Sequence, residues 1–213
     1  MSRIDKIVIF DWGGVIESHR DGEYNIRTAI VNLMKKYGCN LPDNEIIDIY
    51  SKCDELEHDI YSDFSFIGEW FEGVKTKLGL NCNLDEFVNS YYEDFKKIHF
   101  YKDVVEYAHS LKEKCKIGIF SNLMMIDAER IDLQVNLEKF DYVFLSFKIR
   151  HRKPEIEAYK IVEQTTKIKP ENILFIDDMN QNLEVPKQRG WHTCNAFGYE
   201  LDKIKDAVDN FLK

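Results

Sequence analysis

The chain has 213 residues, of which 44% are hydrophobic, 13% aromatic and 31% charged. This composition is typical of a globular domain and excludes a disordered chain, which would combine few aromatic residues with high charge. No apolar run approaches the roughly 20 residues that span a bilayer. Residues Met1 to Lys6 do not resemble a signal peptide. We therefore expect a cytoplasmic protein without a membrane partner.

The formal net charge of −9 is concentrated in one part of the chain. Residues 17–98 contain 9 Lys and Arg against 17 Asp and Glu, a net charge of −8. Such a segment repels a polyphosphate backbone, so we expect no nucleic-acid partner. The five cysteines never form a Cys-x-x-Cys pair. We expect reduced, buried thiols rather than a disulfide framework or a zinc site.

The first predicted element is a buried strand at residues 4–10, which leads into a tight turn at Asp11 to Gly14. From there to residue 98, apolar residues recur at helical spacing. They predict four helices, with no strand between them, near residues 26–37, 43–53, 67–78 and 84–95. The aromatic side chains of this segment are expected to pack its core: Phe66, Trp70, Phe71, Tyr91, Tyr92 and Phe95.

After residue 100, strands and helices alternate. Strands are predicted at 116–121, 140–146, 173–177 and 192–196, separated by helices at 103–114, 127–138, 154–165 and from 180, with a terminal helix. This alternation indicates βαβ units and a parallel sheet covered on both faces. The expected fold is α/β, a Rossmann-like doubly wound parallel sheet with an inserted four-helix cap. Residues 1–16 and 99–213 would form the core, and residues 17–98 the cap.

Polar residues follow the predicted strands at the points where the strands end. They are Asp11, Ser121 with Asn122, the basic loop ending in Lys153, and Asp177 with Asp178. Ligands of open parallel sheets bind outside the carboxyl ends of the strands, so we expect these side chains to meet in one site. Carboxylates suit Mg²⁺, and lysine and serine side chains bind phosphoryl oxygens. The sequence therefore predicts chemistry on a phosphate group.

Four short segments, in this order, resemble the motifs of the haloacid dehalogenase superfamily, in particular its aspartate-nucleophile phosphatases with a helical cap. They are Phe10 to Val15, Phe120 to Asn122, Arg152 to Glu155, and Phe175 to Asp178 with Asn182. The stretch from Leu145 to Pro154, with Tyr159 after it, is similar to one branch of that family. This branch contains bacterial sugar-1-phosphate phosphatases and the N-terminal phosphatase domain of soluble epoxide hydrolases.

The resemblance implies a Mg²⁺-dependent phosphomonoesterase that acts on a small phosphorylated metabolite such as a sugar phosphate. The sequence does not reveal the oligomeric state, and a monomer is the default expectation. Asp11 would be the nucleophile and form an aspartyl-phosphate. Asp11, the backbone carbonyl of Gly13 and Asp178 would hold the metal. The remaining implied roles are phosphate binding by Ser121, Asn122 and Lys153, and orientation of the site by Asp177 and Asn182. The other basic loop residues, Lys148, Arg150 and Arg152, are expected to be mainly solvated.

The chain departs from the family at Gly13. Most phosphatases of the family have a second aspartate there, which donates and accepts a proton during the reaction. Positioned proton transfer contributes about 100- to 10,000-fold to a rate. Glu17, His19 and Asp21 are the nearest possible substitutes, and His19 has a suitable intrinsic pKa. The alternative to an acid/base role for His19 is that it is an ordinary solvated histidine in a loop.

Three alternative functions stay open at this point. Dehalogenases of the superfamily also lack the second aspartate, but they need no metal and lack a pair like Asp177 and Asp178. A phosphonoacetaldehyde-hydrolase-like activity would need a Schiff-base lysine in the cap, for which Lys52 is the mid-cap candidate besides Lys35 and Lys36. A protein that only binds a phosphorylated ligand or a partner would have no need of the nucleophile Asp11.

Overall fold

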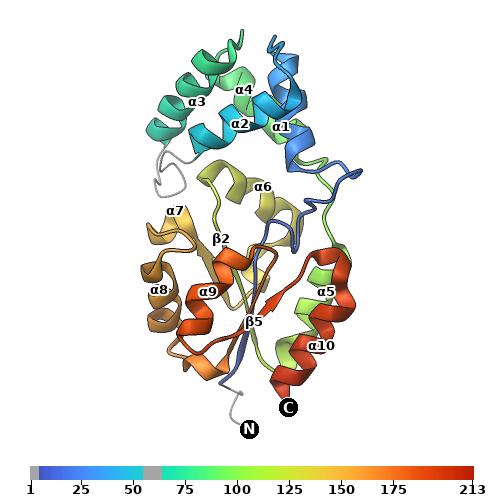
Figure 1. Ribbon diagram of the computed structural model, residues 1–213, viewed down its shortest axis with the longest axis vertical. Coiled ribbons are helices and arrows are strands. Elements are labelled where there is room, and N and C mark those ends of the chain that lie inside the picture. Colours follow the sequence, from blue (N-terminus) through green and yellow to red (C-terminus); the bar gives the residue numbers. More distant parts are fainter. Residues whose placement is uncertain (1–4, 55–63) are drawn as a thin grey trace.

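The computed structural model describes residues 5–54 and 64–213, which form a sheet-centred core and a helical cap (Figure 1). The cap contains α1 (Ile26–Lys36), α2 (Asp43–Asp54), α3 (Phe64–Leu78) and α4 (Leu84–Phe95). The core contains β1 (Ile7–Phe10), α5 (Lys102–Ser110), β2 (Lys116–Ser121), α6 (Met125–Val135), β3 (Tyr142–Leu145), α7 (Ser146–Ile149), α8 (Ile156–Thr166), β4 (Ile173–Asp177), α9 (Asn180–Gln188), β5 (His192–Asn195) and α10 (Leu201–Leu212).

The five strands are all parallel and lie in the order β3-β2-β1-β4-β5. In the central strand β1, Phe10 pairs with Ile119 of β2 on one side and Ile176 of β4 on the other. The carboxyl ends of these three strands are therefore adjacent, which brings the residues that follow them to one edge of the sheet. The predicted fold class is confirmed.

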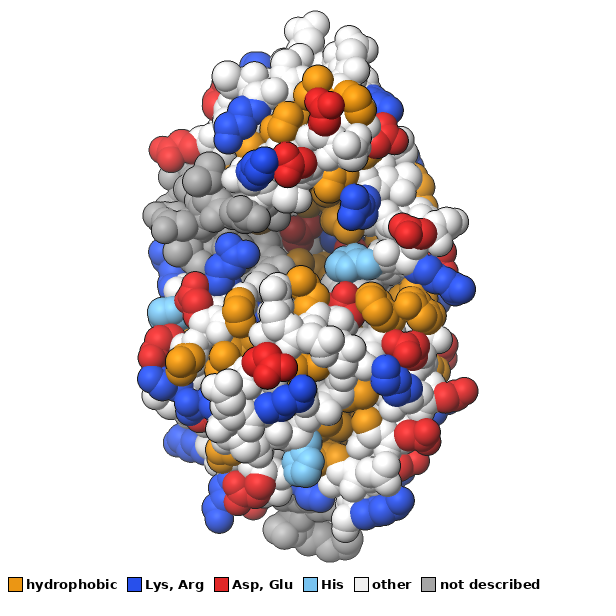
Figure 2. Space-filling model, viewed as in Figure 1, with side chains coloured by type: hydrophobic (Ala, Val, Ile, Leu, Met, Phe, Trp, Pro, Cys, Tyr) orange, Lys and Arg blue, Asp and Glu red, His pale blue; other side chains and the backbone are white. Residues whose placement is uncertain are grey.

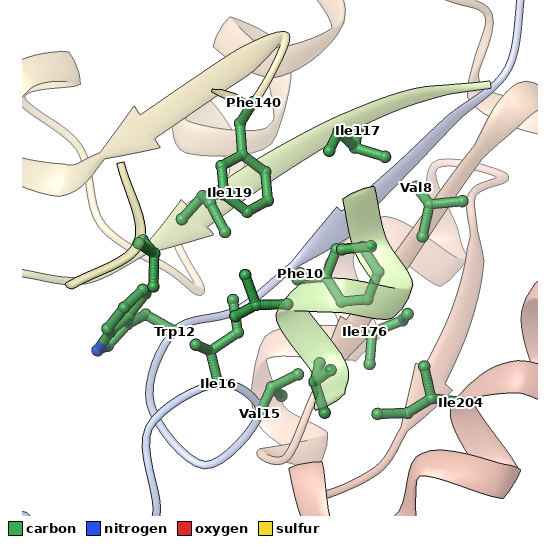
Figure 3. Packing of buried hydrophobic residues seen from close by; sticks show 14 of the residues in the cluster. Val8, Phe10, Trp12, Val15, Ile16, Ile117, Ile119, Phe140, Ile176 and Ile204 are labelled. Carbon is green, nitrogen blue, oxygen red and sulfur yellow. The ribbon is translucent and has the colours of Figure 1, made fainter. Parts of the chain in front are cut away.

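Alternate side chains of β1 reach opposite faces of the sheet. Val8 and Phe10 join a cluster that includes residues of α5 and α10, such as Ile204 (Figure 3). Ile7 and Ile9 belong to a second cluster with residues of α8 and α9. Burial on both faces explains why β1 is an unbroken apolar run rather than an alternating pattern.

Residues from all four cap helices form an apolar cluster, which Met124 and Ile126 of the core also join. Trp70, Phe71, Tyr91 and Phe95 are buried there as predicted, Tyr92 is partly buried, and the side chain of Phe66 lies outside the described part of the structure. Polar side chains bond the first backbone N–H groups of α1 and α4 and so fix where these helices begin. The side chain of Asn25 accepts a hydrogen bond from Thr28 N at the start of α1, and Asn83 and Glu86 form a capping box at α4.

The chain crosses between core and cap twice, and the two crossings, residues 16–18 and 99–101, lie side by side; we call them the hinge. Ser18 N donates to His99 O, and Tyr101 N donates to Ile16 O, both at 2.8 Å. This pairing holds the segment after Asp11 close to the mouth of the cap. The boundaries predicted at 16/17 and 98/99 fall within this paired segment and stay a prediction.

Three further findings bear on the sequence predictions. The strand predicted at 140–146 is the shorter β3, which ends at Leu145 because the chain enters the short helix α7 at Ser146. The hydroxyl of Ser146 hydrogen-bonds the backbone N–H and carbonyl of Leu123. All five cysteines are buried and unbridged. None of the helices in the described ranges combines the length and apolar character needed to cross a membrane.

Candidate active site

A cavity of about 620 Å³ separates the carboxyl ends of the central strands from the cap. Asp11, Lys153 and Asp178 line it from the core, and Ile30 and Tyr91 line it from the cap. Figure 2 shows a hollow between core and cap with acidic side chains visible inside and Lys, Arg and His side chains around its mouth. The residues predicted from the strand ends therefore line one cavity, with the exception of Asp177.

Asp11 directly follows β1 and is 6% exposed. Its Oδ1 accepts a hydrogen bond from Trp12 N at 2.6 Å and lies 2.9 Å from Lys153 Nζ. No residue in the described part of the chain hydrogen-bonds its Oδ2. One oxygen of the carboxylate is thus fixed, and the other is left for chemistry in the cavity.

Asp177 is fully buried at the end of β4, and described residues occupy both of its oxygens. Lys153 Nζ donates to Oδ2 at 2.7 Å, Met179 N donates to Oδ1 at 2.8 Å, and Asn182 Nδ2 lies within 3.1 Å of both oxygens. Asp177 does not line the cavity. Its contacts position Lys153 and Asn182.

The site holds more carboxylates than cations. One oxygen of each of Asp11, Asp177 and Asp178 lies within 4.8 Å of the others, and Lys153 is the ammonium among them. Burial, followed by the charge of Asp11, raises the pKa of Asp177 to about 6 although Lys153 opposes the shift. A divalent cation with oxygen ligands would offset this repulsion, so the donor set fits Mg²⁺. Asp11 and Asp178 have the cavity-facing positions for it.

Ser121 and Asn122 follow β2 and also line the cavity. The side chain of Asn122 makes two bonds to the backbone of Lys153: Nδ2 donates to its carbonyl and Oδ1 accepts from its N–H, both at 2.9 Å. Asn122 therefore fixes the lysine loop, a role that sequence reasoning missed. In the same loop Lys148 and Arg150 are exposed as predicted, but Arg152 lines the cavity.

The two glycines of the first motif are required for different reasons. Gly14 has φ 71°, and a Cβ there would lie 2.3 Å from Cγ of Asp178. Gly13 does not have a left-handed backbone, but a Cβ there would lie 2.9 Å from Cε1 of His19. Gly14 thus permits the close approach of Asp178, and Gly13 leaves room for an imidazole.

We expect Gly14→Ala to destabilise the fold more than Gly79→Ala. Gly79 also has a left-handed backbone, φ 66°, but nothing lies within 4 Å of a Cβ there. The control should lose about 1–2 kcal/mol from backbone strain alone. Gly14→Ala should lose about 1–3 kcal/mol more, because Asp178 must move. Urea unfolding of both variants measures the difference, and equal losses would contradict the close approach.

The three proposed substitutes for the missing acid/base lie in different surroundings. The His19 side chain is 36% exposed, with Nδ1 3.7 Å from Asp178 Oδ2. Burial alone would lower the pKa of His19, but Asp178, with smaller contributions from Glu17 and Asp11, raises it. Glu17 is buried and paired with Arg130, and Asp21 is exposed and outside the cavity lining. His19 therefore has the position that a longer side chain at residue 13 would need.

Sequence reasoning also missed Asp127 and Arg130, which line the cavity from α6. Their i, i+3 spacing on a predicted helix was the available signal, because it places both on one helix face. Which way that face points depends on the tertiary structure.

Comparison with known proteins identifies the family. A model of the haloacid dehalogenase-like hydrolase family matches residues 8–196. The chain belongs to this family. Its hydrolase character and the predicted superfamily are thereby confirmed.

Two relatives share shorter stretches with this chain. Bifunctional epoxide hydrolase 2 of Rattus norvegicus is 29% identical over 98 residues, which are 43% of this chain and 18% of the relative. Enolase-phosphatase E1 of Pectobacterium carotovorum is 31% identical over 52 residues, 24% of this chain and 23% of the relative. The aligned stretches thus span less than a quarter of either relative.

Solved structures of the family share the fold at low sequence identity. A family enzyme of Bacteroides thetaiotaomicron, in complex with magnesium and inorganic phosphate, has a TM-score of 0.70 and 20% identity over 89% of this chain and 92% of its own. L-2-haloacid dehalogenase of Xanthobacter autotrophicus has a TM-score of 0.64 and 19% identity over 88% and 76%. Fold likeness therefore does not distinguish a phosphatase from a dehalogenase.

Proposed function

We propose that the protein is a Mg²⁺-dependent phosphomonoester hydrolase that acts on a small phosphorylated metabolite, such as a sugar phosphate, through an aspartyl-phosphate at Asp11. One observation carries this proposal. Asp11, whose Oδ2 has no hydrogen-bond partner among the described residues, lines a cavity in which Lys153 supplies a buried cation and Asp178 a second carboxylate. A nucleophile, a phosphate-binding cation and oxygen ligands for a metal meet there.

In the first step, Asp11 Oδ2 attacks phosphorus, the bond from phosphorus to the leaving oxygen breaks, and that oxygen takes up a proton. Lys153 and the Ser121 hydroxyl bind phosphoryl oxygens, and Asn122 holds the lysine loop in place. In the second step, a water oxygen bonds to phosphorus while the bond from Asp11 to phosphorus breaks. Phosphate leaves and the carboxylate is restored.

His19 is the group proposed to move the protons in both steps. Its ring lies beside Gly13, in the space a side chain at residue 13 would take. It would donate a proton to the leaving oxygen and then accept one from the attacking water. Glu17 is unsuited to this role because its Oε2 is held 2.5 Å from Arg130 Nη1.

Asp11, Asp178 and the backbone carbonyl of Gly13 would hold Mg²⁺, with Asp177 and Asn182 orienting the site. The ion would supply positive charge that lets the phosphate and the carboxylates lie together. The chain's own cation, Lys153, is already shared between Asp11 and Asp177.

Two alternatives are weakened by side-chain positions. Lys52 Nζ donates to Asp48 at 2.7 Å, its side chain is 64% exposed, and it does not line the cavity, which argues against a Schiff-base mechanism. Lys35 and Lys36 are also bonded away from the cavity, to Asp43 and Ser90. A dehalogenase has no use for the carboxylate cluster around Asp178.

Removal of divalent metal should abolish phosphatase activity, because Lys153 is then left to offset the repulsion among the three carboxylates and the phosphate. We expect hydrolysis of p-nitrophenyl phosphate to stop in EDTA and to return when excess Mg²⁺ is added. Chloride release from 2-chloropropionate in EDTA is the parallel assay for the dehalogenase alternative. Metal-independent phosphate release, or chloride release without phosphate release, would contradict the proposal. A panel of phosphorylated metabolites would then identify the substrate.

A further inference from the structure

A second group of charged side chains lies in the cavity, at the cap side of α6. Arg130, 2% exposed, donates from Nη1 to Glu17 Oε2 at 2.5 Å and from Nη2 to Asp127 Oδ1 at 3.3 Å. Tyr91 of the cap donates to the same Asp127 oxygen at 2.5 Å. All four residues line the cavity. We call Glu17, Asp127 and Arg130 the α6 trio.

The cap side of the cavity is mainly apolar. Its lining there consists of Ile26, Ile30, Ile47, Tyr50 and Tyr91 with the polar Arg27 and Ser51, and Met124 lines the cavity from the segment before α6. Buried ion pairs stabilise a fold no better than well-packed apolar side chains of similar size. Binding pockets, in contrast, are mostly apolar with a few placed polar groups that provide specificity. The α6 trio therefore lies where a polar group that provides substrate specificity is expected.

The hydrogen bonds within the α6 trio are incomplete. Burial alone would lower the pKa of Arg130, but Glu17 and Asp127 raise it, so the guanidinium stays charged beside two carboxylates. Its Nε is buried and has no acceptor among the described residues. Glu17 Oε1 has no donor among them either. Among the described residues, Arg130 thus keeps unused donors and Glu17 an unused acceptor, and the three side chains have a formal net charge of −1.

We propose that the α6 trio binds the leaving group of the substrate, and that it takes a neutral leaving group that carries hydroxyls. This inference rests on the proposed phosphatase function. A hydroxyl accepts from an N–H and donates to a carboxylate, whereas an ammonium can only donate and a carboxylate can only accept. A carboxylate or a second phosphate placed against Glu17 Oε1 would also meet a like charge there. The core helix and the hinge, together with the cap, would then select the substrate.

The test compares kcat/KM for four phosphomonoesters of similar size. Glycerol 3-phosphate carries free hydroxyls, n-propyl phosphate carries none, 3-phosphoglycerate has a carboxylate, and phosphoethanolamine has an ammonium. We expect glycerol 3-phosphate to be preferred over each of the others by about 10- to 100-fold, the effect of a hydrogen bond to a charged group. Equal rates, or preference for any of the other three, would overturn the proposal.

Arg130→Lys keeps a positive charge beside Glu17 but loses Nε. It should reduce the preference for glycerol 3-phosphate over n-propyl phosphate about tenfold. Arg189→Lys is the matched control, because Arg189 makes a similar pair with Glu163 outside the cavity, and it should leave the preference unchanged. The melting temperature shows whether each variant folds. An unchanged preference in folded Arg130→Lys would contradict a role for this side chain.

Two readouts separate this inference from the proposed function. Hydrolysis of p-nitrophenyl phosphate, which has no hydroxyls for the trio to bind, reports on the phosphatase function alone. Calorimetric binding of the four phosphates to the Mg²⁺-loaded Asp11→Asn variant ranks the leaving groups without turnover. Hydrolysis without a preference for hydroxyls overturns only the inference, and a preference in binding without hydrolysis overturns only the function.

Discussion

Asp11→Asn should lower phosphatase turnover by about 10,000-fold or more, which is the scale of losses when a catalytic nucleophile is removed. The amide is nearly isosteric with the carboxylate, so it preserves packing at a side chain that is 6% exposed. It lacks the electron density to attack phosphorus, and it offers Lys153 a neutral partner in place of a charged one. The fold should therefore persist while the first chemical step stops.

The measurement for Asp11→Asn is p-nitrophenyl phosphate hydrolysis at saturating Mg²⁺. Mass spectrometry of rapidly acid-quenched enzyme adds a direct readout, because wild type should carry a phosphoryl group on the peptide that contains Asp11 and the variant should not. Asp21→Asn is the matched control, since Asp21 is an exposed carboxylate near the hinge and outside the cavity lining. Asp11→Asn turnover within tenfold of wild type would refute the aspartyl-phosphate mechanism.

His19→Ala should have the second-largest effect, and the effect should depend on the leaving group. A sugar 6-phosphate has an ordinary alcohol as leaving group, which needs a proton in order to depart. We therefore expect kcat/KM for it to fall about 100- to 10,000-fold. A sugar 1-phosphate, whose departing oxygen is stabilised, should lose much less. Wild type should consequently show a weak dependence on leaving-group basicity, and His19→Ala a steep one.

His151→Ala is the control for this experiment. The His151 side chain is 39% exposed against 36% for His19, and it also lies beside a carboxylate, with Nδ1 3.1 Å from Glu155 Oε2. It should leave both rates unchanged. Glu17→Gln should not make the leaving-group dependence steeper, because Glu17 is bound to Arg130. Equal losses on both substrates in His19→Ala would mean that His19 binds or positions the substrate without moving the proton.

The positions of Gly13 and His19 also decide how the aspartate that most phosphatases of the family have at residue 13 can be restored. An aspartate at residue 13 would meet the imidazole, since the Cβ alone lies 2.9 Å from His19 Cε1. Gly13→Asp in the wild type is therefore a poor test of the missing carboxylate. Combined with His19→Ala, the same substitution has the space it needs.

The amino-acid sequence by itself determined the fold class and the residues at the strand ends. Apolar runs that end in Asp11, Ser121 and Asp177 reflect local rules, because a strand buried on both faces must be apolar throughout and its polar residues collect where it ends. The helical spacing of the cap residues is equally local. For these reasons the parallel sheet, the inserted helices and most of the cavity floor were predictable.

Only the tertiary structure decided which of these side chains contact one another, and therefore which role each of them can have. Asn122 reaches the lysine loop 31 positions away, and Glu17 meets Arg130 across 113 positions. His19 enters the space beside Gly13 because the hinge segments pair and turn that loop back over the strand ends. Sequence spacing does not encode such distances, since they depend on how separate elements pack and on which side chain fills the volume that another leaves.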